Sequence, residues 1–215
     1  MGLEPLMARK TDSTRGSSDE WSLFEAEAQY AESIFRNALG DIQASVAAAQ
    51  RALEIKPGYP PAVLTMGSIE YQRGRDAEGE RLFRSLLSLP DEAGDLWEVI
   101  DKAGGFLIQD QRYRDAMELY EAAVRRFPER AMLYQGLGCC AGHEGLFDMA
   151  VAASQKALEL APDSQELTND LGWSLVEAGR LEEAEKVLLR AVDMDPSDDL
   201  ARGNLLNCQA ALPKR

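Results

Sequence analysis

The stretch that decides the fold runs from residue 165 to residue 198 and reads QELTNDLGWSLVEAGRLEEAEKVLLRAVDMDPSD. Four landmark residues in it recur 34 positions earlier, and recur again 34 positions before that. The three sets are Gly172, Ala184, Ala191 and Pro196; Gly138, Ala150, Ala157 and Pro162; and Gly104, Ala116, Ala123 and Pro128. Self-similarity at a fixed period of this length indicates an array of stacked structural repeats.

Each repeat is predicted to be a pair of helices. Within 168–178, apolar residues recur at i, i+4 and i+7, which places them on one face of a helix. Gly179 ends this segment, since glycine tolerates the left-handed conformation of a helix cap. A second amphipathic segment, 181–193, follows, and the small residues Gly172 and Ala184 let the two helices approach closely. Because one such hairpin cannot bury its apolar face alone, neighbouring hairpins stack.

This pattern resembles the tetratricopeptide repeat family, in which an aromatic residue, Leu-Gly, further aromatic residues, two Ala and a Pro recur at set places. The resemblance is carried by Tyr134, Leu137, Gly138, Ala150, Ala157 and Pro162; by Leu171, Gly172, Ala184, Leu188, Ala191 and Pro196; and by Gly104, Ala116, Tyr120, Ala123 and Pro128. It implies an all-α fold, a right-handed superhelix (α-solenoid) of antiparallel helical hairpins. The implied repeats are 26–59, 60–93, 97–130, 131–164 and 165–198.

The first repeats depart from the family pattern. Glu32 and Ser33 stand where Leu-Gly is usual, and the first helix is therefore predicted to pack through Phe24, Ala28, Ala31 and Phe35. The second repeat has Gly79 in place of Ala. Residues 94–96 form an insertion that reads either as a tolerated loop extension or as a functional hinge.

Both ends of the array also carry signals. Residues 1–18 read as a disordered leader, and residues 19–215 as a single domain. Ser17 and Glu20 match a capping box, which predicts that the first helix starts there. A closing helix over 199–212 is predicted to shield the last hairpin through Ala201, Leu205, Cys208 and Leu212.

Composition restricts the class of partner. The formal net charge is −14, which argues against nucleic acid, because phosphates call for clustered Lys and Arg. The three cysteines make no disulfide framework and fit a reducing compartment. No apolar run has the length of a signal peptide or a membrane span. We therefore expect a cytoplasmic protein with no membrane insertion.

The sequence offers little to support catalysis or a cofactor. Cys139, Cys140 and His143 form the one metal-like cluster, but adjacent cysteines diverge by about 100° on a helix, and structural zinc wants four ligands. Cys140 is expected to point into the hairpin. His143 is the only histidine, and nothing marks the orienting group or oxyanion site that a Cys–His pair would need. The sequence predicts no enzyme, no metal and no cofactor.

The resemblance also implies where a ligand lies. In the family, the first helix of each hairpin lines a concave groove. The candidate partner-binding residues carried over are Tyr30, Ile34, Asn37, Leu64, Ser68, Tyr71, Asp101, Lys102, Ile108, Gln135, Cys139, His143, Asn169, Asp170, Trp173 and Glu177, with Gly105 and Val176 beside them. Some relatives grip a C-terminal carboxylate with Lys, Asn and Arg. The matching places here hold Tyr30, Ile34, Thr65, Glu98 and Lys102, so that clamp is absent.

These observations predict a protein–protein interaction module, such as an adaptor, a co-chaperone or a complex-assembly factor. Its groove is expected to take a protein or peptide segment with basic and apolar residues. Trp173 is either the apolar anchor of that site or a strut against the closing helix near Asn204 or Asn207. The alternative function is a self-assembling scaffold that forms homo-oligomers. The sequence does not name the partner.

Overall fold

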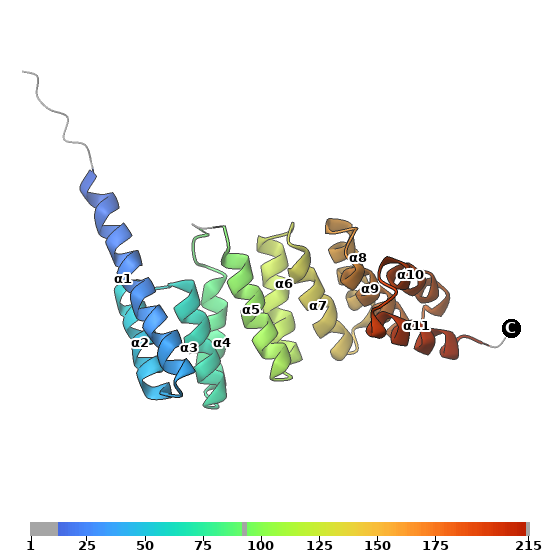
Figure 1. Cartoon of the computed structure of the whole chain (residues 1–215), viewed down its shortest axis with the longest axis horizontal. Helices are drawn as coiled ribbons and strands as arrows, with labels where there is room; N and C mark the ends of the chain where they lie inside the picture. Colours follow the sequence, from blue (N-terminus) through green and yellow to red (C-terminus); the bar gives the residue numbers. More distant parts are fainter. Residues whose placement is uncertain (1–12, 92–93, 214–215) are drawn as a thin grey trace, which may run out of the picture. The chain divides into compact units, whose positions relative to one another are not determined.

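The computed structural model describes residues 13–91 and 94–213, with side chains from residue 20 onward, and all of the regular secondary structure in these ranges is helical (Figure 1). The eleven helices described are α1 (Ser13–Ala38), α2 (Ile42–Ile55), α3 (Pro60–Gln72), α4 (Asp76–Leu86), α5 (Leu96–Gln109), α6 (Tyr113–Arg126), α7 (Ala131–His143), α8 (Phe147–Leu160), α9 (Gln165–Glu177), α10 (Leu181–Met194) and α11 (Asp199–Ala211). The prediction of an all-α fold is confirmed. None of these described helices is long and apolar enough to cross a membrane.

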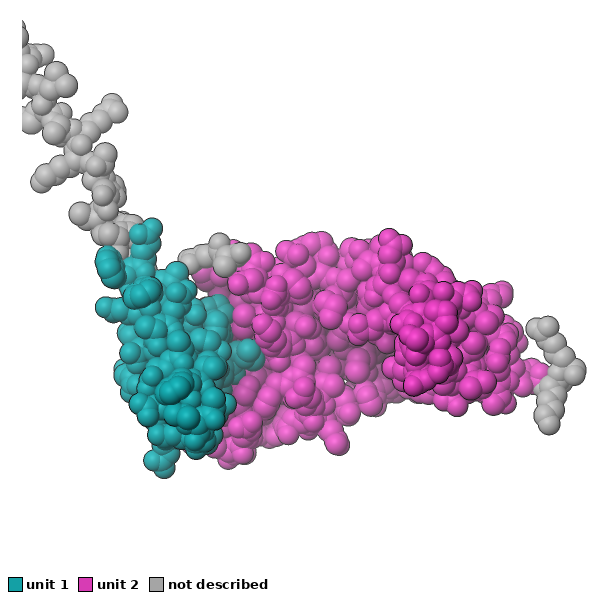
Figure 2. All heavy atoms as spheres, in the orientation of Figure 1, with its two compact units in different colours: residues 1–66 teal, residues 67–215 magenta. Residues whose placement is uncertain are grey.

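The chain divides into two compact units, residues 1–66 and residues 67–215 (Figure 2). The division falls inside α3, and a single domain over 19–215 stays a prediction. Within the second unit, α5 packs on α6, α7 on α8 and α9 on α10. Each pair packs on the next in chain order, and α11 packs on α10 and α9.

Small residues hold the paired helices of the second unit close together. Ala116, Ala150 and Ala184 are fully buried at the positions where the repeat places them. A Cβ atom built on Gly172 would lie 2.6 Å from Cγ of Leu188, which is shorter than real Cβ contacts. The glycine therefore creates the space into which Leu188 of α10 packs against α9.

Two glycines on neighbouring helices enclose one tyrosine. A Cβ atom on Gly104 of α5 would lie 2.4 Å from Cζ of Tyr120, and one on Gly136 of α7 would lie 2.2 Å from the same atom. The Tyr120 ring on α6 thus fills the space between α5 and α7, and its side chain is buried. Its hydroxyl donates to Oδ1 of Asp101 at 3.0 Å, so the ring has little freedom to move.

The first unit packs differently from the prediction. Phe24 and Phe35 are 62% and 56% exposed, and Ala28 and Ala31 are exposed as well, so the predicted packing stripe of α1 faces solvent. Its opposite face is buried against α2, which offers the small buried residues Ser45, Ala48, Ala49 and Ala52. Small side chains of α1 fit against this surface, whereas aromatic rings would force the two helices apart.

The first helix starts earlier than predicted, whereas the closing helix lies where it was predicted. Helix α1 begins at Ser13, so residues 13–18 of the predicted leader are helical, and residues 1–12 lie outside the described residues. Ser17 lies inside α1 and cannot cap its start, because a capping residue precedes the first helical turn. At the other end, α11 occupies the place of the predicted closing helix and buries Ala201 and Cys208.

Adjacent glycines on α5 give a sharp test of this packing. The Gly104→Ala change should lower the free energy of unfolding by about 1–3 kcal/mol, because its methyl group meets the enclosed Tyr120 ring. The Gly105→Ala change should raise it by up to about 1 kcal/mol, because a Cβ there meets open space and alanine favours the helix. Urea unfolding measures both. Equal effects of the two changes would contradict the described packing of Tyr120.

Candidate functional site

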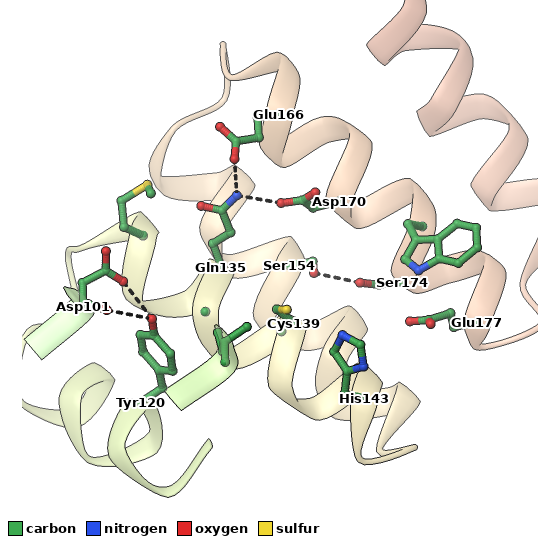
Figure 3. A pocket seen from close by; sticks show the side chains of 15 residues that line it. Asp101, Tyr120, Gln135, Cys139, His143, Ser154, Glu166, Asp170, Ser174 and Glu177 are labelled. Carbon is green, nitrogen blue, oxygen red and sulfur yellow. Dashed lines mark hydrogen bonds between the residues drawn. The ribbon is translucent and has the colours of Figure 1, made fainter. Parts of the chain in front are cut away.

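A groove of about 530 Å³ opens on the second unit and is lined mainly by α5, α7 and α9 (Figure 3). These are the first helices of three successive hairpins, as the resemblance implied. The lining residues are Asp101 and Ile108 of α5; Tyr120 of α6; Met132, Gln135, Gly136, Gly138, Cys139 and His143 of α7; Ser154 of α8; and Glu166, Asp170, Trp173, Ser174 and Glu177 of α9. Its volume lies in the range of ligand-binding pockets.

Two carboxylates of α9 share one amide donor in this groove. Nε2 of Gln135 donates to Oδ2 of Asp170 at 2.7 Å and to Oε1 of Glu166 at 2.8 Å (Figure 3). Burial raises the pKa of Asp170 above its usual range, and the nearby charge of Glu166 adds to this, while the Gln135 hydrogen bond opposes it. The groove therefore holds a carboxylate that lacks a full positive counter-charge.

Asp101 forms a second acidic point at the opposite side of the groove, on α5. Tyr120 donates to its Oδ1 atom and, at 3.2 Å, to its main-chain oxygen. Burial raises the pKa of the Asp101 carboxyl, and the hydrogen bond from Tyr120 lowers it in part. Because Tyr120 is itself enclosed by two glycines, the position of the Asp101 side chain is fixed by the helix packing.

Trp173 supplies the large apolar surface of the groove. Its side chain is 38% exposed, whereas Leu171 and Leu175 on the same helix are buried in the core. In the same groove, the hydroxyls of Ser154 and Ser174 form a hydrogen bond of 2.9 Å that joins α8 to α9. Indole rings combine a large apolar face with an N–H donor and are frequent anchors at interfaces. Trp173 thus stands as an apolar platform between acidic groups.

The surroundings of Cys139, Cys140 and His143 indicate packing roles for these side chains. Cys140 is buried, and burial raises the pKa of its thiol to about 12, whereas Cys139 lies in the groove, where burial also raises its pKa. The His143 ring stacks on Tyr113, with ring centroids 3.9 Å apart. In the described part of the chain, no three His, Cys, Asp or Glu side chains form a group that could hold a metal ion. Raised thiol pKa values disfavour the nucleophilic thiolate.

The groove brings together half of the residues that sequence predicted for it. These are Asp101, Ile108, Gln135, Cys139, His143, Asp170, Trp173 and Glu177. Lys102 is exposed outside the lining, and Ser68 of α3 also lies outside it. The remaining predicted residues of the first unit are Tyr30, which packs on Tyr59 at 5.8 Å, the exposed Ile34 and Asn37, and the half-buried Leu64.

Two of the predicted groove residues are core residues instead. Tyr71 is buried against Phe83 and Phe106, with ring centroids 5.4 and 6.0 Å away. It occupies the space that Gly79 leaves free, which explains the glycine where the family has alanine. Asn169 is buried and accepts a hydrogen bond of 3.0 Å from Nδ2 of Asn204, so it joins α9 to α11.

Several lining residues were absent from the predicted set, namely Tyr120, Met132, Gly136, Gly138, Ser154, Glu166 and Ser174. Gly136 is the lining residue that the sequence could have indicated most clearly. A glycine inside a helix weakens that helix, so its presence there indicates that a neighbouring group packs closely against the backbone. Tyr120 and Ser154 come from the second helices of their hairpins, whereas the resemblance implied a groove lined by the first helices.

Comparison with known proteins agrees with this architecture. Two family models, each described as tetratricopeptide repeat, match residues 107–165 and 143–210. The structure also resembles the crystal structure of YrrB, a TPR protein with an unusual peptide-binding site, with a TM-score of 0.58 and 19% identity. That match covers 90% of this chain and 97% of YrrB. The fold is that of a helical-repeat protein, and the chain belongs to the tetratricopeptide repeat family.

Two curated relatives are similar over much of the chain. Protein FlbA of Caulobacter vibrioides is 24% identical over 152 residues, which are 70% of this chain and 25% of FlbA. The peroxisomal targeting signal receptor of Candida albicans is 24% identical over 184 residues, which are 78% of this chain and 30% of the receptor. The chain thus spans about a quarter to a third of the length of these relatives.

The half-buried charge of Asp170 leads to a prediction about stability. Its folded-state pKa lies above the ordinary value of 3.8, so the folded protein holds that proton more tightly than the unfolded chain does. Asp170 therefore costs stability above the raised pKa, and this cost disappears as the pH falls through it. The Asp170→Asn variant should be more stable than wild type at pH 7, with the gain shrinking in acid.

Thermal unfolding of wild type and of the Asp170→Asn variant, at pH 7 and at acidic pH, measures this difference in stability. The matched control is Asp193→Asn, which removes the same charge from an exposed site outside the groove and should leave stability nearly unchanged. A loss of stability in Asp170→Asn at neutral pH would contradict the assignment of Asp170 as a desolvated carboxylate.

Proposed function

We propose that this chain is a protein-interaction module whose groove binds a segment of another protein that carries a basic residue beside an apolar anchor. The observation that carries the proposal is the lining of the groove. Four of its fifteen residues are carboxylates, Asp101, Glu166, Asp170 and Glu177, and none is Lys or Arg. A groove of this composition favours a cationic side chain over an anionic one.

The desolvated carboxylates supply the electrostatic part of this binding. The pKa values of Asp170 and Asp101 are raised mainly by burial, which means that their charged forms lack compensation in the unbound groove. A Lys or Arg side chain of a partner would provide the missing positive charge and would favour the ionised carboxylates. Binding of such a segment should therefore release protons and strengthen as the pH rises through these pKa values.

The apolar part of the binding rests on Trp173, with Ile108 and Met132 on the other lining helices. Met132 is exposed and Ile108 half-buried, so both retain apolar surface that a partner would cover. Covering this surface together with the indole removes apolar area from water, which is the main driving force of such contacts. The combination specifies an apolar side chain close to a basic one in the partner.

Features of similar proteins support a peptide as the partner. YrrB is described as having an unusual peptide-binding site, and one curated relative is a receptor for the peroxisomal targeting signal. Among peptide-binding proteins, we propose that the chain acts as an adaptor, a co-chaperone or a complex-assembly factor. It would work in the cytoplasm without catalysis or a cofactor. Nucleic acid is not an expected partner, because the acidic groove and the net charge of −14 repel phosphates.

A peptide display selection on the purified protein tests the proposal. We expect selected peptides to be enriched in Lys or Arg next to an apolar residue. The Trp173→Ala change should weaken their binding by about 2 kcal/mol, as for an interface hot spot. Asp170→Asn should weaken it most at low salt, because charge attraction is screened by salt. Isothermal titration of one selected peptide against each variant measures the losses.

Asp193→Asn is again the matched control and should bind like wild type. If Trp173→Ala binds normally but unfolds at a lower temperature, Trp173 is a structural strut and the partner lies elsewhere. Selected peptides without basic residues would contradict the electrostatic part of the proposal. Light scattering at two protein concentrations checks the alternative of a self-assembling scaffold, which would show a mass that rises with concentration.

A further inference from the structure

Helix α1 of the first unit carries an apolar stripe that faces solvent. Trp21, Phe24, Ala28, Ala31, Phe35 and Ala38 form this α1 stripe. Every one of these residues is exposed, and Trp21 reaches 66%. Their spacing alternates between three and four residues, the repeat by which one helix meets another in a coiled coil. Exposed apolar patches on a soluble protein mark interaction sites.

The other face of α1 is fixed to α2, so the stripe cannot turn inward. Ala26 and Ser33 are buried against α2, and the hydroxyls of Ser33 and Ser45 form a hydrogen bond of 3.1 Å. Further along, Nε of Arg51 donates to the side-chain oxygen of Gln29 at 2.7 Å. Rotating α1 to bury the stripe would break both contacts. The exposed direction of the stripe is therefore set by the packing of the unit itself.

The order of side chains along the α1 stripe fits a helix as its occupant. Aromatic residues stand towards both ends of the stripe. The Trp21 and Phe24 rings meet edge to face near the N-terminal end, with centroids 6.4 Å apart, and Phe35 lies near the C-terminal end. Ala28 and Ala31 lie between them, and small side chains let a second helix approach closely. A narrow stripe with this period covers one facing helix, rather than the broad face that buries against a domain core.

The charges that flank the stripe define the partner. In coiled-coil terms, six positions lie on either side of the apolar seam. Four of them hold Glu20, Glu25, Glu27 and Glu32, and the two towards the C-terminal end hold the exposed Ile34 and Leu39. The nearby Arg36 is already engaged, because its Nε donates to Glu32 at 2.6 Å. A second copy of this chain would bring glutamates against glutamates, and an anionic lipid surface would be repelled in the same way. Lysine or arginine on the facing helix would instead pair with these acids.

From this geometry we propose that the α1 stripe is a docking site for an amphipathic helix of another protein, with an apolar seam flanked by Lys and Arg. This site lies wholly on the first unit and uses none of the groove residues of the second. Its energetics also differ from those of the groove, since three of its four flanking glutamates are exposed, whereas burial raises the pKa of the groove carboxylate of Asp170. Binding should accordingly weaken as salt screens the flanking glutamates.

Two synthetic peptides provide the probe. Each has three heptads with Leu and Ala along its seam, and they differ only in carrying Lys or Glu at the flanking positions. We expect the Lys peptide to bind the full chain and the Glu peptide to bind at least about tenfold more weakly, measured by isothermal titration. The Trp21→Ser, Phe35→Ser double variant should lose at least about tenfold in affinity for the Lys peptide.

Because this double variant keeps every charge of the protein, its loss separates seam docking from general attraction to an acidic surface. Its circular dichroism and thermal midpoint should match wild type, since both side chains are exposed. The control is the Leu200→Ser, Leu206→Ser double variant, which changes exposed leucines of α11 and should bind like wild type. In the Glu25→Lys, Glu27→Lys double variant two lysines and two glutamates flank the seam, so the preference for the Lys peptide should disappear.

Three results would overturn the proposal. The first is equal binding of both peptides, and the second is Lys-peptide binding that survives the Trp21→Ser, Phe35→Ser change. The third is a wild-type dimer in light scattering that this double change converts to a monomer, which would make a second copy the occupant. Trp173→Ala should leave Lys-peptide affinity intact, so failure of the groove proposal and failure of this one are distinguishable.

Discussion

The architecture of the second unit depends on the close approach of two helices at positions too small for an ordinary side chain. Gly172 is the clearest case, because Leu188 already occupies the place where a Cβ would lie. Buried alanines on the facing helices meet the same requirement. Since this spacing recurs at the same place in each repeat, it sets the register of each hairpin. The register in turn decides which side chains of α5, α7 and α9 reach the groove.

The groove shows how the same packing places charge where water is scarce. Tyr120 is held between Gly104 and Gly136, and its hydroxyl positions Asp101. Gln135 joins Asp170 to Glu166 across neighbouring helices. These arrangements keep carboxylates partly buried at a cost to folding, which is typical of sites selected for binding rather than for stability. In the function that we propose, a partner that supplies positive charge offsets this cost.

The 34-residue repeat follows from positions counted along the chain, and the resemblance to the family then implied the groove residues, of which half, including Trp173 and Asp170, lie in the lining. The same transfer by position failed for Tyr71 and Asn169, since their burial depends on partners that the repeat period does not specify. Tyr71 packs on Phe106 of another helix, and Asn169 bonds to Asn204 of the closing helix.

The error in α1 has a different physical cause. An apolar stripe at helical spacing indicates that a helix face will be covered, but not by what. Phe24 and Phe35 were assigned to the core for this reason, whereas α2 packs on the opposite, small-residue face of α1. The hydrophobic pattern therefore marked an apolar face of α1 correctly, but it did not specify which face α2 covers.

We propose that a partner segment lies in the groove on α5, α7 and α9, and nuclear magnetic resonance can locate it there. A peptide with one Lys beside one Leu is titrated into the isotope-labelled chain, and amide and indole shifts are followed. We expect shifts of the Trp173 indole N–H and of α7 and α9 amides around Gln135 and Asp170. Shifts confined to α10 and α11, with the Trp173 indole unmoved, would show that the segment binds elsewhere.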